Sequence, residues 1–242
     1  MKIRAILFDL DGTLIDQFEP IYRAFSRTLC EMGFPRPSFE KVKRSVGGAS
    51  EATMAKLIGP ERAAEAVDIL RPIFEEEMLN GLKPLPGVME GLKQLNNEGI
   101  QCAVLTNKYG PHARTACAHL GMSKYLKFTI GANDTEWKKP NPKLTAIALD
   151  RLGFSNLETI YIGDSPYDFQ TAKNAELSCN LLCTGTHSFD ELSVLQSDRI
   201  HSTFVDLLEW LKNHILGNQL QKLGLTENLL PSTLFITLPL KL

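Results

Sequence analysis

The 242-residue sequence has little of several features that mark particular classes of protein. It contains five cysteines, none of them in a Cys-X-X-Cys pair, and its net charge is only −2. No apolar run reaches the about 20 residues that a membrane-spanning helix needs, and no secretory leader precedes the first predicted strand. We therefore expect a cytoplasmic protein with reduced thiols that binds neither a membrane nor nucleic acid.

What the sequence does contain is an alternation of strands and helices, in a chain that is 43% hydrophobic. Short apolar runs bounded by turn residues predict strands, and segments with apolar residues at helical spacing lie between them. Strands separated by helices favour a parallel sheet with helices on both faces. The predicted fold is a Rossmann-like three-layer α/β/α core, with strands at residues 3–9, 100–106, 127–131, 158–164 and 178–185.

A block of helical pattern at residues 17–82 interrupts this alternation. Because the first strand belongs with the later ones, the block is predicted to be an α-helical cap domain inserted into the core. The core then consists of residues 1–16 and 83–216, and the segment KPLPG marks the return to it. Within the cap, two short helices are expected on either side of Gly47 and Gly48.

The C-terminal tail at residues 217–242 follows a last amphipathic helix at residues 204–215, and the sequence assigns it no role. The tail contains two prolines and the apolar stretch TLFIT. Such a stretch either packs on the core or contacts a partner, and the second alternative includes a homodimer. Both interpretations stay open.

Polar and charged residues follow the predicted strands at the ends where ligands bind. In an open parallel sheet, ligands lie beyond the carboxyl ends of the strands, so the residues just after each strand are the candidates for function. Those residues are Asp9, Asp11, Thr106, Asn107, Lys139, Asp164 and Asp168.

The acidic residues among them predict a metal site. In extended chain, residues i and i+2 point to the same side, so Asp9 and Asp11 are expected to face one cavity. Their repulsion is costly unless a cation joins them, and Asp164 brings a third carboxylate to the same edge. Hard oxygen ligands suit Mg²⁺, which often shares its site with substrate phosphate. Lys139, in a proline-rich loop, would neutralise part of the remaining negative charge.

These residues also have structural interpretations. The Asp-Gly segment after the first strand fits a turn with a threonine helix cap. Asp168 fits a capping acid three residues after Ser165, and this role is compatible with a role at the metal. Thr106 fits a plain turn, and Lys138 with Lys139 fits a solvated pair of cations.

Taken in order, the segments FDLDGT, VLTN, KKPNP and IGDSPYD resemble the four motifs of the haloacid dehalogenase superfamily. The resemblance is to the subgroup with a helical cap inserted after the first strand, and it spans residues 3–214. The segments SVGGASEATM, LKPLPGV and VLTNK are most similar to phosphoglycolate phosphatases and their close relatives. The tail has no counterpart in this resemblance.

The resemblance implies a role for each residue at the strand ends. Asp9 would be the nucleophile and a Mg²⁺ ligand, and Asp11 would be the general acid and base, with its backbone carbonyl also on the metal. Asp164 would bind the metal directly, and Asp168 would help to hold the metal or its waters. The phosphoryl oxygens of a small phosphorylated metabolite would be bound by Thr106, Asn107 and Lys139.

Asp11 bears on the type of reaction, because an alkoxide leaving group needs a proton whereas a halide does not. The dehalogenases and phosphonatases of this superfamily lack aspartate at this position. The sequence therefore favours a Mg²⁺-dependent phosphatase that works through an aspartyl-phosphate. A phosphomutase of the β-phosphoglucomutase kind shares the aspartate and remains an alternative. A regulatory protein that keeps the fold and binds a partner through its tail is a third hypothesis.

The cap is expected to choose the substrate. Its cations Lys41, Lys43 and Arg44 precede the glycine pair, where they would grip a small anionic tail or, alternatively, lie on a solvated helix face. Cap opening is expected to hinge near residues 16–18 and 83–86. The five histidines show no metal-ligand spacing and are assigned no catalytic role.

Overall fold

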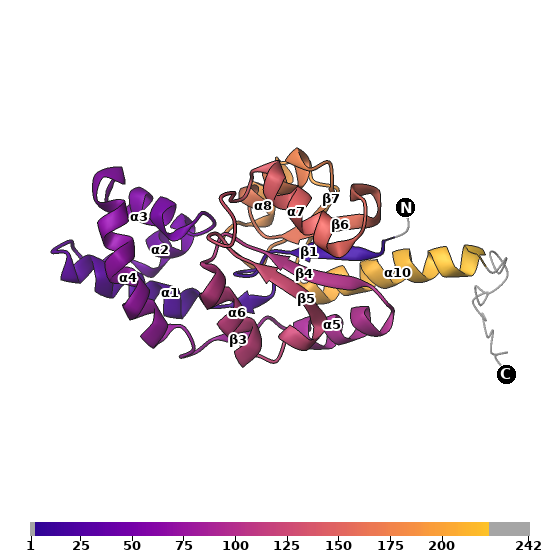
Figure 1. The fold of residues 1–242 in the computed structure, drawn as a ribbon, viewed down its shortest axis with the longest axis horizontal. Helices are drawn as coiled ribbons and strands as arrows, with labels where there is room; N and C mark the ends of the chain where they lie inside the picture. Colours follow the sequence, from indigo (N-terminus) through magenta and orange to yellow (C-terminus); the bar gives the residue numbers. More distant parts are fainter. Residues whose placement is uncertain (1–2, 223–242) are drawn as a thin grey trace, which may run out of the picture.

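The computed structural model describes residues 3–222, and its central feature is a six-stranded sheet (Figure 1). All strand pairs in this sheet are parallel, in the order β5-β4-β1-β6-β7-β8, so the predicted α/β fold is confirmed. The strands are β1 (Ala5–Phe8), β4 (Gln101–Leu105), β5 (Leu126–Ile130), β6 (Thr159–Gly163), β7 (Ser178–Leu182) and β8 (Arg199–His201).

Strand β1 shows how the two faces of the sheet become two layers of core. Ile6 and Phe8 belong to a buried cluster with residues of α5, α6 and α10, whereas Ala5 and Leu7 belong to a second cluster with residues of α7, α8 and α9. A strand covered on both faces needs apolar residues at every position, which explains the uninterrupted AILF. The covering helices are α5 (Val88–Asn97), α6 (Gly110–His119), α7 (Pro142–Leu152), α8 (Pro166–Asn174), α9 (Phe189–Ser193) and α10 (Phe204–Lys222).

The inserted segment forms a separate helical body beside the sheet (Figure 1). Its helix α1 buries Ile21, Phe25 and Leu29, which are spaced so that they share one helix face. The predicted pair of short helices is confirmed, since one ends and the other begins around the Gly47–Gly48 segment. The helices are α1 (Phe18–Glu31), α2 (Phe39–Ser45), α3 (Ser50–Ile58) and α4 (Ala63–Glu77), and short 3₁₀ turns lie at Pro60–Arg62, Ser123–Tyr125 and Asn156–Glu158.

A short antiparallel ribbon joins this helical body to the core. It pairs β2 (Ile15–Asp16) with β3 (Lys83–Pro84), and the buried Gln17 side chain donates from Nε2 to the carbonyl oxygen of Met78 at 2.5 Å. These contacts hold the start and the end of the insertion together. The domain boundaries at 16/17 and 82/83 stay a prediction, and both lie beside this ribbon.

Two elements differ from the sequence predictions. Strand β8 has only one apolar residue, Ile200, between Arg199 and His201, so no strand pattern announces it. Helix α10 continues to Lys222, past its predicted end at residue 215, so the first part of the predicted tail is helical. The rest of the tail, including TLFIT, lies outside the described residues.

The cysteines agree with the expectation of packed, unpaired thiols. All five are free, and Cys102, Cys117 and Cys179 are buried, while Cys30 is exposed and Cys183 is half-buried. Among the helices of residues 3–222, none combines the length and the apolar character that crossing a membrane requires.

The position of α10 against the sheet gives a stability prediction. Leu207 is fully buried in the cluster under β1, so Leu207→Ala should lower the free energy of unfolding by about 2–5 kcal/mol. Val194→Ala, at a side chain that is 74% exposed, is the control and should change it by less than about 0.5 kcal/mol. Urea unfolding of the three proteins measures both values, and equal stabilities would contradict the packing of α10.

Candidate active site

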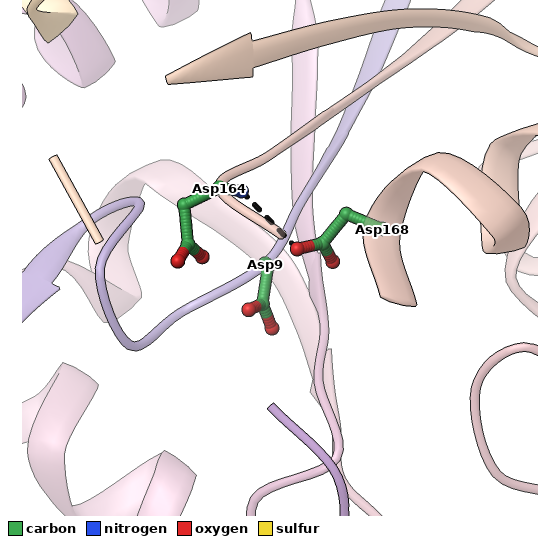
Figure 2. Close-up of side chains that lie close together, drawn as sticks. All are labelled: Asp9, Asp164 and Asp168. Atoms are coloured by element: carbon green, nitrogen blue, oxygen red, sulfur yellow. Dashed lines mark hydrogen bonds between the residues drawn. The ribbon is translucent and has the colours of Figure 1, made fainter. Parts of the chain in front are cut away.

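Three buried carboxylates meet at the carboxyl edge of the sheet. Asp9 follows β1 and Asp164 follows β6, and these two strands are hydrogen-bonded neighbours. Asp168 lies in the first turn of α8. One oxygen of each carboxylate lies within 4.8 Å of the others (Figure 2). Within the described residues, this is the one group of acidic, histidine or cysteine side chains close enough to hold a metal ion together.

Asp168 has both of its oxygens occupied by hydrogen-bond donors. Oδ2 accepts from the backbone N–H groups of Asp164 and Ser165, each at 3.1 Å, and from the Ser165 hydroxyl at 2.6 Å. Oδ1 accepts from Lys139 Nζ at 2.7 Å and from the Tyr161 hydroxyl at 3.1 Å. The capping role predicted for Asp168 is therefore confirmed, and the carboxylate also anchors Lys139. Its proposed part in metal binding stays a prediction.

Lys139 is the cation inside the carboxylate group. Its side chain is 1% exposed, and Nζ lies 2.8 Å from Asp9 Oδ1 and 2.7 Å from Asp168 Oδ1. Burial by itself would lower the pKa of Lys139, but the attraction of Asp168 and Asp9 outweighs it and holds this pKa well above its usual value. Lys138 is exposed, so the inward lysine is Lys139, as predicted.

Asp9 and Asp164 carry more negative charge than this single lysine balances. Burial raises the pKa of Asp9 to about 6, with repulsion from Asp168 and Asp11 acting in the same direction and Lys139 acting against it. Burial, followed by repulsion from Asp168 and Asp9, also raises the pKa of Asp164 well above its usual value. The buried Asp9 Oδ1 has the Lys139 ammonium 2.8 Å away. A group of buried carboxylates with this excess of negative charge fits a hard divalent cation such as Mg²⁺.

Two glycines leave room for the Asp164 carboxylate. A Cβ on Gly185 would lie 1.7 Å from Asp164 Oδ2, and one on Gly12 would lie 2.8 Å from the same atom. Gly12 also has a φ of +83°, which disfavours other residues. The Thr13 hydroxyl and the Thr186 N–H, both at 3.2 Å, donate to the two oxygens of Asp164. These two hydrogen bonds orient the carboxylate. The glycine in the first motif is explained by the space that the carboxylate occupies and by the positive φ of Gly12.

Asp11 lines the same cavity as Asp9, in agreement with the predicted orientation, but its carboxylate has a separate partner. Lys108 Nζ lies 3.2 Å and 3.0 Å from its two oxygens, and both side chains are largely buried. The sequence analysis did not single out Lys108. The feature that could have identified Lys108 is its position two residues after Thr106. This position follows the end of β4 and lies at the same edge of the sheet.

Thr106 and Asn107 are both buried at the end of β4. The Thr106 hydroxyl accepts from the Lys108 backbone N–H at 3.2 Å and also lines the cavity. Asn107 accepts from the Lys139 backbone N–H at 2.9 Å and donates to the carbonyl oxygens of Lys139 and Gly47, at 3.2 Å and 3.3 Å. Asn107 therefore holds the Lys139 loop and contacts the cap. Its predicted contact with a phosphoryl oxygen is untested.

The cap cations Lys41, Lys43 and Arg44 do not line the cavity between cap and core. Arg44 instead forms a bidentate ion pair with Glu191 on α9, at 2.5 Å and 3.1 Å, and donates to the carbonyl oxygen of Thr186 at 2.6 Å. Of the two alternatives left open for these cations, the structure does not support a substrate grip, and Arg44 binds the core.

The cavity itself has a volume of about 160 Å³ and draws residues from both sides. Five of its polar lining residues carry no motif: the two loop residues Asn133 and Thr186 and three more. The other three are Arg71 on α4, and Tyr109 and His112 at the start of α6.

The family profile described as haloacid dehalogenase-like hydrolase matches residues 6–181. A phosphoglycolate phosphatase of Yersinia pestis is 30% identical over 213 residues, which cover 85% of this chain and 92% of that protein. One from Aquifex aeolicus is 29% identical over 88% of this chain and 99% of its own length. A haloacid dehalogenase-like hydrolase from Bacteroides fragilis has a similar structure, with a TM-score of 0.81 and 26% identity over 85% of this chain and all of that one.

The raised pKa of Asp9 predicts a pH-dependent stability. Its folded-state pKa of about 6 exceeds its usual 3.8, so the folded protein favours the protonated form, and ionisation costs stability as pH rises from about 4 through about 6. Without divalent cations, the free energy of unfolding of the wild type relative to Asp9→Asn should fall by about 3 kcal/mol over this range. Added Mg²⁺ should offset the fall, and more so at pH 7 than at pH 5.

Thermal and urea unfolding in chelator and in Mg²⁺, from pH 4 to pH 7, measure both effects. A wild-type minus Asp9→Asn difference that does not change with pH would contradict the charge imbalance at Asp9.

Proposed function

Because this chain belongs to the haloacid dehalogenase-like hydrolase family, we propose that it is a Mg²⁺-dependent phosphatase of a small phosphate monoester. The observation that carries the proposal is the charge balance at the strand ends. Three buried carboxylates, Asp9, Asp164 and Asp168, face one ammonium, that of Lys139. If all are ionised, the cluster lacks two positive charges, which matches one divalent cation. Asp9 and Asp164 would hold that cation, which would neutralise charge on the substrate phosphate when bound.

In the first step, an Asp9 oxygen attacks phosphorus. A bond forms between this oxygen and phosphorus, and the bond from phosphorus to the ester oxygen breaks, which leaves an aspartyl-phosphate and an alkoxide. Asp11 gives its proton to the alkoxide, which departs as an alcohol. Lys139 favours the ionised form of Asp9 and reduces its repulsion of the anionic phosphate.

In the second step, water attacks the phosphorus of the aspartyl-phosphate. Asp11, now ionised, accepts a proton from this water as the new phosphorus–oxygen bond forms and the bond to Asp9 breaks. Inorganic phosphate leaves, and the two carboxyl groups regain their starting states. The Asp11 carboxylate lines the cavity and contacts Lys108 there, and in the proposed reaction it would leave Lys108 to reach each reacting oxygen.

The other residues of the edge position these groups. We propose that Asp168 and Tyr161 position the Lys139 ammonium. The Tyr161 hydroxyl accepts from Lys139 Nζ at 3.2 Å and lies 3.1 Å from Asp168 Oδ1. Thr106 and the backbone N–H groups at the start of α6 are proposed to bind the phosphoryl oxygens, because N–H groups at the N-terminus of a helix favour anions. Asn107 keeps the Lys139 loop against the end of β4.

The substrate we propose is 2-phosphoglycolate or a phosphate monoester of similar size, acted on in the cytoplasm. The support is the likeness to phosphoglycolate phosphatases over most of both chains and the small cavity beside Asp9. A phosphomutase has the same two aspartates, and transfer of phosphate within a sugar without release would reveal it.

Asp9→Asn should lower phosphate release by more than about 10³-fold and leave the fold intact, because an amide oxygen is a poor nucleophile. The measurement is phosphate release from a panel of phosphate monoesters, with Mg²⁺ and with chelator. The panel includes 2-phosphoglycolate, sugar phosphates and an aryl phosphate. Substantial turnover by this variant would refute the nucleophile assignment. No turnover by the wild type on any ester would favour an interaction protein instead.

Asp164→Asn and Asp168→Asn should separate metal binding from lysine positioning. Asp164→Asn should weaken Mg²⁺ binding at least about tenfold more than Asp168→Asn does, because the Asp168 oxygens already have donors. Asp168→Asn should mainly lower kcat, since Lys139 loses one of its two carboxylate partners. Calorimetric Mg²⁺ titration and steady-state kinetics on the folded variants test this. Equal losses of Mg²⁺ affinity would make Asp168 a metal ligand.

A further inference from the structure

The cavity between cap and core has an acidic floor and one cation on its cap wall. The floor contains Asp9, Asp11 and Asp164, which the proposed reaction uses. Among the cap residues that line the cavity, Glu51 and Arg71 carry charge, and the others are apolar or small and polar. The cap cations that the sequence suggested for substrate binding, Lys41, Lys43 and Arg44, do not line the cavity, so Arg71 is the cap cation that a bound molecule would meet.

Arg71 is held by an aromatic ring and has no carboxylate partner among the described residues. Its guanidinium carbon lies 5.0 Å from the centroid of the Tyr109 ring, and the residue is exposed. Stacking of this kind fixes the guanidinium plane and leaves its N–H groups available. Most other arginines of the cap do pair with carboxylates, in the pairs Arg23–Glu77, Arg27–Glu76, Arg44–Glu191 and Arg62–Glu65.

The neighbouring polar groups are already engaged. Lys108 Nζ binds both oxygens of Asp11 and lies 4.7 Å from the centroid of the Phe74 ring. His112 Nε2 lies 3.2 Å from Glu75 Oε1, and burial lowers the pKa of His112 below its usual value. An anionic group that enters between cap and core therefore meets the guanidinium N–H groups of Arg71 on the cap wall, while on the core side the exposed Lys138 also lines the cavity.

We propose that Arg71 recognises the substrate by binding a carboxylate that the phosphate monoester carries at its other end. A planar carboxylate matches the two parallel N–H groups of a guanidinium. The cavity of about 160 Å³ is smaller than the about 300–1,000 Å³ of typical ligand sites, so the phosphate and the carboxylate are only a few bonds apart. The substrate class is a phosphorylated small hydroxy acid. This inference rests on the proposed function and deepens it.

The kinetic test compares two esters of similar size, 2-phosphoglycolate and 2-hydroxyethyl phosphate, which lacks the carboxylate. Arg71→Gln should lower kcat/KM for 2-phosphoglycolate by about 10–100-fold, mainly through KM, because a charged hydrogen-bonded pair is lost. The same change should alter kcat/KM for 2-hydroxyethyl phosphate by less than about threefold. Arg71→Lys should recover part of the loss.

Arg36→Gln is the matched control, since Arg36 also stacks on a tyrosine of the cap, Tyr22, but does not line the cavity. Arg36→Gln should leave kcat/KM for both esters unchanged. If Arg71→Gln lowered kcat/KM equally for the two esters, or for neither of them, the proposal would be overturned.

A binding measurement keeps this inference separate from the proposed reaction. In the Asp9→Asn background, calorimetric titration with 2-phosphoglycolate needs no turnover. Adding Arg71→Gln to that background should weaken binding by at least about tenfold, and adding Arg36→Gln should not. If the wild type hydrolyses nothing but Arg71 still governs binding, the phosphatase proposal fails and the carboxylate site stands. Binding that is indifferent to Arg71 would overturn the carboxylate site alone.

Discussion

The buried ion pairs of Lys139 are the interaction on which the proposed site depends. Its ammonium lies between Asp9, at the end of β1, and Asp168, on α8. An isolated buried ammonium would be costly, and so would either carboxylate alone, because burial removes the water that stabilises each charge. The three charges together are tolerated, and the two ion pairs of Lys139 hold the loop after β5 against the middle of the sheet. The excess of negative charge that remains is the reason for expecting a divalent cation beside Asp9 and Asp164.

The cap is attached to the loops that shape this site. Arg44 on α2 donates to the carbonyl oxygen of Thr186, whose own N–H donates to Asp164. On the other side, Asn107 joins the Gly47 carbonyl oxygen of the cap to the Lys139 loop. Both contacts are hydrogen bonds, so a cap movement would act directly on loops that carry Asp164 and Lys139. The β2–β3 ribbon is the covalent link about which such a movement would occur.

The proposed chemistry and the proposed choice of substrate depend on different parts of the chain. The groups proposed to react come from strand ends of the core, where β1 and β6 are buried along their whole length. The wall opposite comes from α4 of the cap, where Arg71 stacks on Tyr109 of the core. One cavity thus combines the proposed reaction floor of the core with the proposed recognition residue of the cap.

The sequence by itself determined the α/β class, the helical insertion and the set of residues at the carboxyl ends of the strands. It could do so because strand runs, helical spacing and motif order are local in the chain. It also identified Asp168 as a capping acid, a role set by its distance from Ser165. The sequence did not predict the short strand β8 or the β2–β3 ribbon, because a few residues of mixed polarity show no periodicity.

Only the tertiary structure decided which cations face the cavity. Lys41, Lys43, Arg44 and Arg71 all lie on cap helices, and their sequence contexts do not distinguish a substrate contact from an ion pair with the core. Arg44 meets Glu191 and Arg71 meets Tyr109 because the packing of cap on core brings together residues far apart in the chain. The same holds for Lys108, whose partner Asp11 precedes it by 97 residues. Long-range pairing of this kind is a property of the assembled fold, and no local pattern encodes it.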